Sequence, residues 1–137
     1  MTDETKSKPR PDISETTRPF WDAIEDDALM VQVDPATGAH QFYPRSTSLA
    51  TGRSDLEWRA VSGRGTVYSY TATLVPIPGF EDDVPYLLAM IDLEEGVRIL
   101  ANMINVTEDE IEIGMPVRVA FEKRDGDVTY FCFEPDS

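Results

Sequence analysis

Cysteine and histidine are almost missing from this chain of 137 residues, which contains one of each. The single cysteine, Cys132, excludes a disulfide within the chain and fits a reducing compartment. A Ser-His-Asp or Cys-His catalytic set would have to use His40, and the neighbours of Cys132 alternate in polarity as they do in a half-buried strand. The sequence offers no self-contained active site, so we expect a chain that is not an enzyme on its own.

Positive charge is also scarce, with 12 Lys and Arg against 26 Asp and Glu and a formal net charge of −14. Phosphate backbones and anionic lipid surfaces are held mainly by Lys and Arg, so this balance argues against nucleic acid and membrane surfaces as partners. No apolar run approaches the ~18 residues of a membrane-spanning helix, and the first residues lack the apolar segment of a secretory signal. We therefore expect a cytoplasmic protein.

The N-terminal part predicts a tail and then a short helix. Residues 1–14 are polar and charged, so we expect a disordered tail. Residues 15–30 predict a helix, because hydroxyl residues that can cap it precede apolar residues at helical spacing. Phe20 and Trp21 are large for so short a helix. Either both pack on the chain's own core, or they anchor a partner protein, since aromatic residues dominate interface energies.

The C-terminal half predicts five strands, expected at residues 66–75, 86–93, 97–104, 117–122 and 128–133. A hairpin turn is expected at Glu94-Glu95-Gly96 and another at Asp125-Gly126. The first strand alternates, which places Tyr68, Tyr70, Ala72 and Leu74 on one face. Residues 76–85, PIPGFEDDVP, contain three prolines and predict a loop. Five strands with a short connector, residues 107–113, between the third and fourth are typical of an OB-fold barrel, here over residues 63–137.

Two turn-like stretches within residues 31–62 repeat a spacing known from metal sites. DPATG and SLATG each place two small polar residues three apart and then a glycine. This is the outline of the two Cys-x-x-Cys-Gly knuckles of a zinc ribbon, with Asp34, Thr37, Ser48 and Thr51 at the cysteine positions. Structural zinc is held by four thiolates or imidazoles, so we expect no zinc. Apolar side chains, and hydrogen bonds from Asp34, Ser48 and Thr51 to the backbone, are expected to hold the turns instead.

Several longer stretches carry a resemblance to a known family over residues 18–135. They are RPFWDAI, GAHQFYPR, DLEWRAVSGRGTVYSYT, FEDDVPYLLAMIDLEEGVRILANM and IGMPVRVAFE. Together they are similar to the zinc-ribbon plus OB-fold proteins of domain-of-unknown-function family 35, which are associated with acyl-CoA. That family usually has four cysteines in its ribbon, so the resemblance also implies that this chain has lost the zinc ligands.

The resemblance implies a non-catalytic subunit that docks on a thiolase or a thiolase-like aldolase and helps shape its acyl-CoA channel, in lipid or steroid metabolism. Phe20, Trp21 and Phe80 are the candidate partner contacts. Phe80, Arg64 and Arg98 are the candidate channel residues, although the two arginines can instead pair with neighbouring carboxylates.

Two other functions stay open from the residues alone. One is a stand-alone acyl-CoA-binding protein, which would need a basic pocket for the CoA phosphates. The other is a single-stranded nucleic-acid-binding OB-fold that stacks bases on Tyr68 and Tyr70, which the net charge disfavours.

Overall fold

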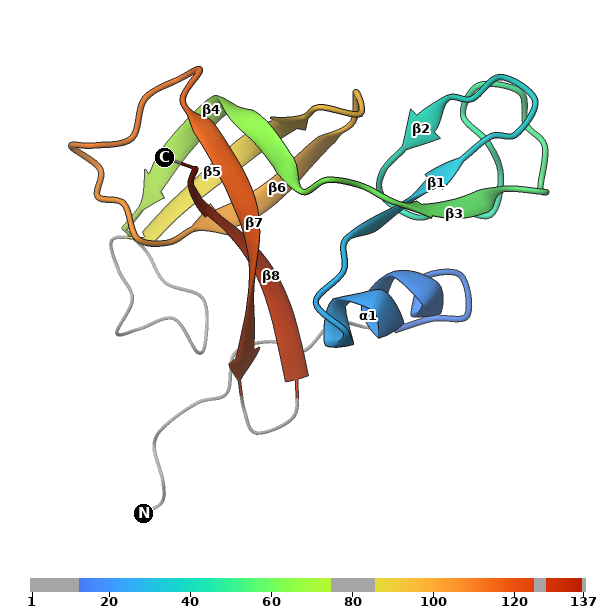
Figure 1. The fold of residues 1–137 in the computed structure, drawn as a ribbon, viewed down its shortest axis with the longest axis horizontal. Helices are drawn as coiled ribbons and strands as arrows, with labels where there is room; N and C mark the ends of the chain where they lie inside the picture. The colour runs from blue at the N-terminus through green and yellow to red at the C-terminus, as the bar shows by residue number, and fades with distance from the viewer. Residues whose placement is uncertain (1–12, 75–85, 125–127, 137) are drawn as a thin grey trace, which may run out of the picture.

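The structure, a computed structural model, describes residues 13–74, 86–124 and 128–136 (Figure 1). It is mainly β, with one short helix, a small three-stranded sheet and a closed five-stranded barrel, as the sequence predicts. The loop at residues 76–85 with Phe80, the turn Asp125-Gly126 and residues 1–12 of the expected tail lie outside the described residues.

Helix α1 (Arg18–Glu25) is shorter than the predicted span of residues 15–30. Pro19 lies in its first turn, where a missing N–H costs nothing. The helix ends early because Asp27 adopts a left-handed φ of 59°, and the chain then enters the first strand. Phe20 and Ile24 face inward and are fully buried. Within the described residues, no helix is long and apolar enough to cross a membrane.

The small sheet forms the zinc-ribbon-like part of the chain, which we call the ribbon. Its strands are β1 (Met30–Val33), β2 (His40–Gln41) and β3 (Glu57–Ala60), in the order β2-β1-β3 with antiparallel pairing. Residues 40–44, HQFYP, predict a return strand, but β2 ends at Gln41 and the chain then turns away. The peptide between Phe42 and Tyr43 is cis. The ribbon therefore has little backbone ladder to hold its two knuckles.

The barrel strands are β4 (Arg64–Thr73), β5 (Tyr86–Leu93), β6 (Arg98–Met103), β7 (Pro116–Arg124) and β8 (Val128–Pro135). They close in the order β4-β5-β6-β8-β7, with the parallel pair β6 and β8 meeting at Met103 and Phe133. This is the five-stranded closure of an OB-fold. Figure 1 shows the barrel and the ribbon side by side, with α1 packed against β8 and β1.

A bulge in β4 corrects one prediction about the barrel. The pairing with β5 shifts between Val67 and Ser69, so the simple alternation of the sequence is broken there. Tyr68 lies at the shift, whereas Tyr70 is in register with the inward-facing Ala89. Tyr68 and Tyr70 consequently do not form the single stacking face that the alternation predicts.

The junction between ribbon and barrel is fixed by contacts with the β5–β6 turn. The Ser62 N–H donates to a Glu95 carboxylate oxygen at 2.8 Å, and the Ser62 hydroxyl donates to Glu94 at 2.9 Å. Gly63 has a φ of 79°, and a Cβ there would clash with Cγ1 of Val119. The acidic pair of the predicted hairpin turn thus sets where the ribbon lies on the barrel.

Candidate functional site

The two knuckles of the ribbon keep the same backbone geometry although neither holds a cysteine. In the first, the Gly38 N–H donates to the Asp34 carbonyl at 2.7 Å. In the second, the Gly52 N–H donates to the Ser48 carbonyl at 2.9 Å. Both glycines have a φ of 77°, which a side chain would strain. The outline of a metal site therefore survives in the backbone itself.

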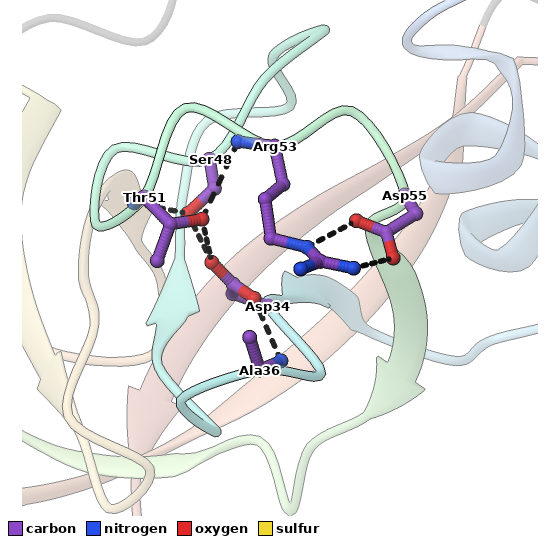
Figure 2. A network of polar contacts seen from close by, with 6 residues as sticks. All are labelled: Asp34, Ala36, Ser48, Thr51, Arg53 and Asp55. Carbon is purple, nitrogen blue, oxygen red and sulfur yellow. Dashed lines mark hydrogen bonds and ion pairs between the residues drawn. The ribbon is translucent and has the colours of Figure 1, made fainter.

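Asp34 takes the central position between the knuckles (Figure 2). Its side chain is 1% exposed, and one carboxylate oxygen accepts hydrogen bonds from the hydroxyls of Ser48 at 2.7 Å and Thr51 at 2.5 Å. The other oxygen accepts from the Ala36 N–H at 2.8 Å. One carboxylate thus ties its own knuckle to the opposite one, as a metal ion does in a zinc ribbon, and we call this group the Asp34 clamp.

The hydrogen bonds of the clamp also set the charge state of Asp34. The Thr51 hydroxyl, followed by the Ser48 hydroxyl, lowers the pKa of the Asp34 carboxyl below its ordinary value of 3.8. The Ala36 N–H and the nearby positive charge of Arg53 act in the same direction, while burial opposes them. Asp34 is therefore ionised at neutral pH, as an acceptor of three hydrogen bonds requires.

Two buried glutamine amides complete the polar interior of the ribbon. The Gln32 amide oxygen accepts from the Arg45 N–H at 2.8 Å, and its nitrogen donates to the Arg45 carbonyl at 2.7 Å. Gln41 accepts from the Leu49 N–H at 2.8 Å and donates to the oxygen of Gln32 at 3.0 Å. These amides thus satisfy backbone groups of Arg45, before the second knuckle, and of Leu49, within it. The sequence analysis missed both residues, although two glutamines at apolar positions of a strand pattern were visible.

The degenerate ligand positions do not fit a zinc ion. Asp34, Ser48 and Thr51 meet, but Thr37 stays outside the clamp and its hydroxyl accepts only from the Ala39 N–H at 3.2 Å. A carboxylate already engaged in three hydrogen bonds, with two neutral hydroxyls, is not a structural zinc donor set. Among the described residues, no group of three or more His, Cys, Asp and Glu side chains could hold a metal.

The predicted aromatic contacts fall into different environments. Phe20 is fully buried, with its ring edge-on to Trp21 at 5.0 Å and to Phe131 at 5.6 Å. Its ring has no surface left for another protein, which argues against Phe20 as a partner contact. Trp21 is half-buried, and its indole N–H has no acceptor within the described part of the chain. Phe80 lies outside the described residues, so its role stays a prediction.

The two predicted channel arginines also differ. Arg64, at the start of β4, is 67% exposed and lies 4.0 Å from Asp136. Arg98, at the start of β6, pairs with Asp92 at 2.6 Å, and its guanidinium lies 3.6 Å from the centre of the Tyr68 ring. The guanidinium covers one face of Tyr68, so that face is not free to stack on a base.

A cavity of about 400 Å³ lies between the ribbon and the barrel. The ribbon contributes the stretch from Ala39 to Phe42 together with Leu49 and Ala50, and the β5–β6 turn contributes Gly96, Val97 and Arg98. His40 and Arg98 therefore line one cleft, which no pattern in the sequence indicates. Arg64 does not line it. A cleft whose wall combines apolar side chains with His40 and an arginine held by Asp92 can take a small, largely apolar group.

Comparison with known proteins identifies the family of this chain. Residues 58–122 match the family described as "ChsH2, C-terminal OB-fold domain". A "DUF35 domain-containing scaffold protein" of Methanothermobacter thermautotrophicus is 36% identical over 89 residues, which cover 61% of this chain and 67% of that protein. The chain belongs to the DUF35 family.

Two further relatives are a chain of a solved aldolase and a longer hydratase subunit. A solved "Ltp2-ChsH2(DUF35) aldolase" chain matches with a TM-score of 0.84 and 31% identity, over 92% of this chain and 98% of that one. The "3-oxo-4,17-pregnadiene-20-carboxyl-CoA hydratase alpha subunit" of Mycobacterium tuberculosis is 33% identical over 128 residues, or 93% of this chain. This chain spans only 40% of that subunit's length.

Proposed function

We propose that this DUF35 chain is a non-catalytic subunit of an acyl-CoA-processing complex, docked on a thiolase-like aldolase or thiolase. The observation that carries the proposal is the match to the Ltp2-ChsH2(DUF35) aldolase chain, which extends over both the ribbon and the barrel. The name of the Mycobacterium tuberculosis relative favours a large apolar acyl group of the steroid type. A lone thiol suits the reducing cytoplasm, where we propose that the complex works.

The chain's own reactive side chains support a non-catalytic role. Cys132 is 3% exposed in β8, and its Sγ lies 3.6 Å from the Ala120 carbonyl, which is the environment of a core residue. His40 is a β2 residue at the wall of the cleft. We therefore assign the carbon–carbon bond chemistry to the partner enzyme and a positioning role to this chain.

Within the complex, we propose that Arg98 rather than Arg64 faces the acyl-CoA. Arg98 lines the cleft beside His40, and its pairing with Asp92 and stacking on Tyr68 hold the guanidinium in one place. A preorganised arginine loses little freedom when it binds a phosphate. Arg64 is exposed on the barrel and has no comparable support.

Co-expression with candidate thiolase-like proteins from the same genome tests the proposal. We expect one hetero-oligomer on size exclusion, retro-aldol cleavage of a steroid-type β-hydroxyacyl-CoA by the complex, and no cleavage by this chain alone. Two separate peaks, together with full activity of the large protein alone, would refute the subunit role.

The cleft also favours a second function, stand-alone binding of acyl-CoA. Its volume of about 400 Å³ lies in the range of small-molecule sites, and Arg98 and His40 lie at its wall. Calorimetric titration of the chain alone with acetyl-CoA separates the two functions. Micromolar binding that Arg98→Ala abolishes would support a stand-alone binder, and the absence of heat would leave the subunit role.

A further inference from the structure

Strand β5 has apolar side chains on both of its faces. Leu87, Ala89 and Ile91 point into the barrel and are at most 5% exposed. Between them, Leu88 and Met90 point outward and are half-buried. A strand that faces water on one side normally alternates apolar and polar residues, and a strand that is apolar on both faces is normally covered on both. β5 thus has the composition of a strand with two covered faces.

The apolar outer surface continues onto both neighbouring strands. Met90 pairs with Leu100 of β6 and with the bulged segment of β4 that carries Tyr68. Leu100 is 54% exposed and Tyr68 is 51% exposed. We call the surface formed by Tyr68, Leu88, Met90 and Leu100 the outer barrel face. The helix packs on β8 and β1, so it lies away from this face (Figure 1).

The charge on the outer barrel face is unlike that of the rest of the chain. The next row along the strands is Asp92 and Arg98, a directly paired couple joined at 2.6 Å. Their charges cancel, so the face is neutral in a chain with a net charge of −14. Interface centres are depleted of unpaired charge, and arginine and tyrosine are the residues that most often carry binding energy there.

We propose that the outer barrel face is the docking surface for the partner enzyme. The matching patch on the partner enzyme is apolar at its centre and bordered by Lys and Arg. This inference rests on the proposed function. A second copy of this chain is a poor occupant, because two chains of charge −14 repel each other as they approach. A partner whose patch has a basic border is instead attracted by the negative charge of this chain. The apolar centre of the partner's patch then covers Leu100 and Tyr68.

The test uses Leu100→Asp and Tyr68→Ala, with Ile13→Asp as the matched control, because Ile13 is also exposed, at 43%, but precedes α1. Binding to the thiolase-like protein that co-elutes with this chain on co-expression is measured by surface plasmon resonance. We expect both face variants to lose about thirtyfold in affinity or more, as hot-spot residues do, and the control to bind like the unchanged chain. Unaltered thermal melting of the variants verifies that they fold.

Each other outcome has a definite meaning. If the unchanged chain does not bind, the proposed function fails; if it binds and Leu100→Asp binds equally well, only the docking face is wrong. A concentration-dependent dimer of the chain alone that Leu100→Asp dissociates would assign the face to a second copy instead. If the partner's patch is bordered by Lys and Arg, the association rate should fall steeply with added NaCl. An association rate independent of salt would contradict the basic border.

Discussion

The ribbon and the barrel bury different kinds of side chain. Among the described residues, the barrel interior is formed by apolar side chains such as Ile91, Ile99 and Phe133, each fully buried. Six polar residues are buried among all the described residues, and the ribbon contains four of them: Gln32, Asp34, Gln41 and Ser48. The barrel also has long strand ladders, whereas β2 has two residues. The ribbon buries Val31 and Val33 as well, but its two knuckles are held by side-chain hydrogen bonds.

The Asp34 clamp shows how hydrogen bonds can join two knuckles of this kind. Zinc joins two knuckles through four strong bonds and contributes directly to folding. In this chain a carboxylate and two amides make the same long-range links with hydrogen bonds that depend on every partner being present. A buried polar group that loses its partner is costly, so the ribbon is the more fragile of the two regions.

The largest change is expected from restoring the metal. Asp34→Cys, Thr37→Cys, Ser48→Cys and Thr51→Cys together place four thiolates on two knuckles that already have the required backbone. Structural zinc binds such sites with about 10–16 kcal/mol, so we expect about one zinc per chain and melting that EDTA lowers. The unchanged chain, purified without a His-tag, should contain far less than one zinc. Elemental analysis measures both, and stoichiometric zinc in the unchanged chain would contradict our reading of the clamp.

The next largest effect is expected in the barrel. Phe133→Ala removes a fully buried ring from the junction of β6, β7 and β8, and should lower the free energy of unfolding by about 3–5 kcal/mol. Because one core cluster joins the barrel to α1 and β1, the whole chain should melt in one transition. Chemical denaturation measures this, with the exposed Leu100→Ala as a control within about 0.5 kcal/mol of the unchanged chain. Two separate transitions would show that the ribbon and the barrel unfold independently.

A smaller, local effect is expected from Asp34→Asn. The amide nitrogen cannot accept the hydroxyl protons of Ser48 and Thr51, so the second knuckle is released while the barrel is unchanged. Amide hydrogen exchange should show faster exchange at Ser48 and Gly52 and unchanged protection in β5. Asp55→Asn is the matched control, because Asp55 is exposed and lies in the same loop. Equal protection at Ser48 and Gly52 in both variants would show that the Asp34 side chain does not hold the second knuckle.

Acid should weaken the ribbon through the same carboxylate. The folded-state pKa of Asp34 lies below its ordinary value of 3.8, so the clamp contributes its full stabilisation above that pH and loses it as pH falls through the folded-state pKa. The difference in stability between the unchanged chain and Asp34→Asn should therefore shrink below pH 3.8. Denaturation at a series of pH values measures it. A difference that is constant from neutral to strongly acidic pH would contradict the shift.

The sequence predicted most of the barrel, because its strands alternate and turn residues separate them. The span predicted for β5, residues 86–93, agrees with the structure, and the Glu94-Glu95-Gly96 turn is where it was expected. The bulge at Tyr68 could not be predicted, because it depends on how β4 pairs with both neighbours. The return strand in the ribbon was predicted too long, because an apolar pair such as Phe42-Tyr43 fits a strand as well as it fits the packing against Phe20.

The candidate site was only partly predictable for a similar reason. The spacing of the knuckles indicated Asp34, Ser48 and Thr51, and it also indicated Thr37, which takes no part in the clamp. The spacing alone does not say which small polar residue points inward. A helix pattern shows that Phe20 is apolar but not that the chain itself covers the ring, which the structure shows to be fully buried. His40 and Arg98 line the same cleft although they are far apart in the sequence, and only the ribbon–barrel junction brings them to it.

The smallest effect is expected from Arg53→Ala, which separates charge from hydrogen bonding in the ribbon. Arg53 makes a two-bond ion pair with Asp55 at 2.8 and 2.7 Å, but both side chains are about half exposed, at 53% and 54%. Such pairs contribute little because water and salt screen them, so the melting temperature should not change measurably. The positive charge of Arg53 also lowers the pKa of Asp34, although less than the hydrogen bonds do, so that pKa should rise slightly in the variant. Titration of the Asp34 carboxyl by NMR measures this. A fall in melting temperature as large as that of Asp34→Asn would show that the guanidinium belongs to the clamp itself.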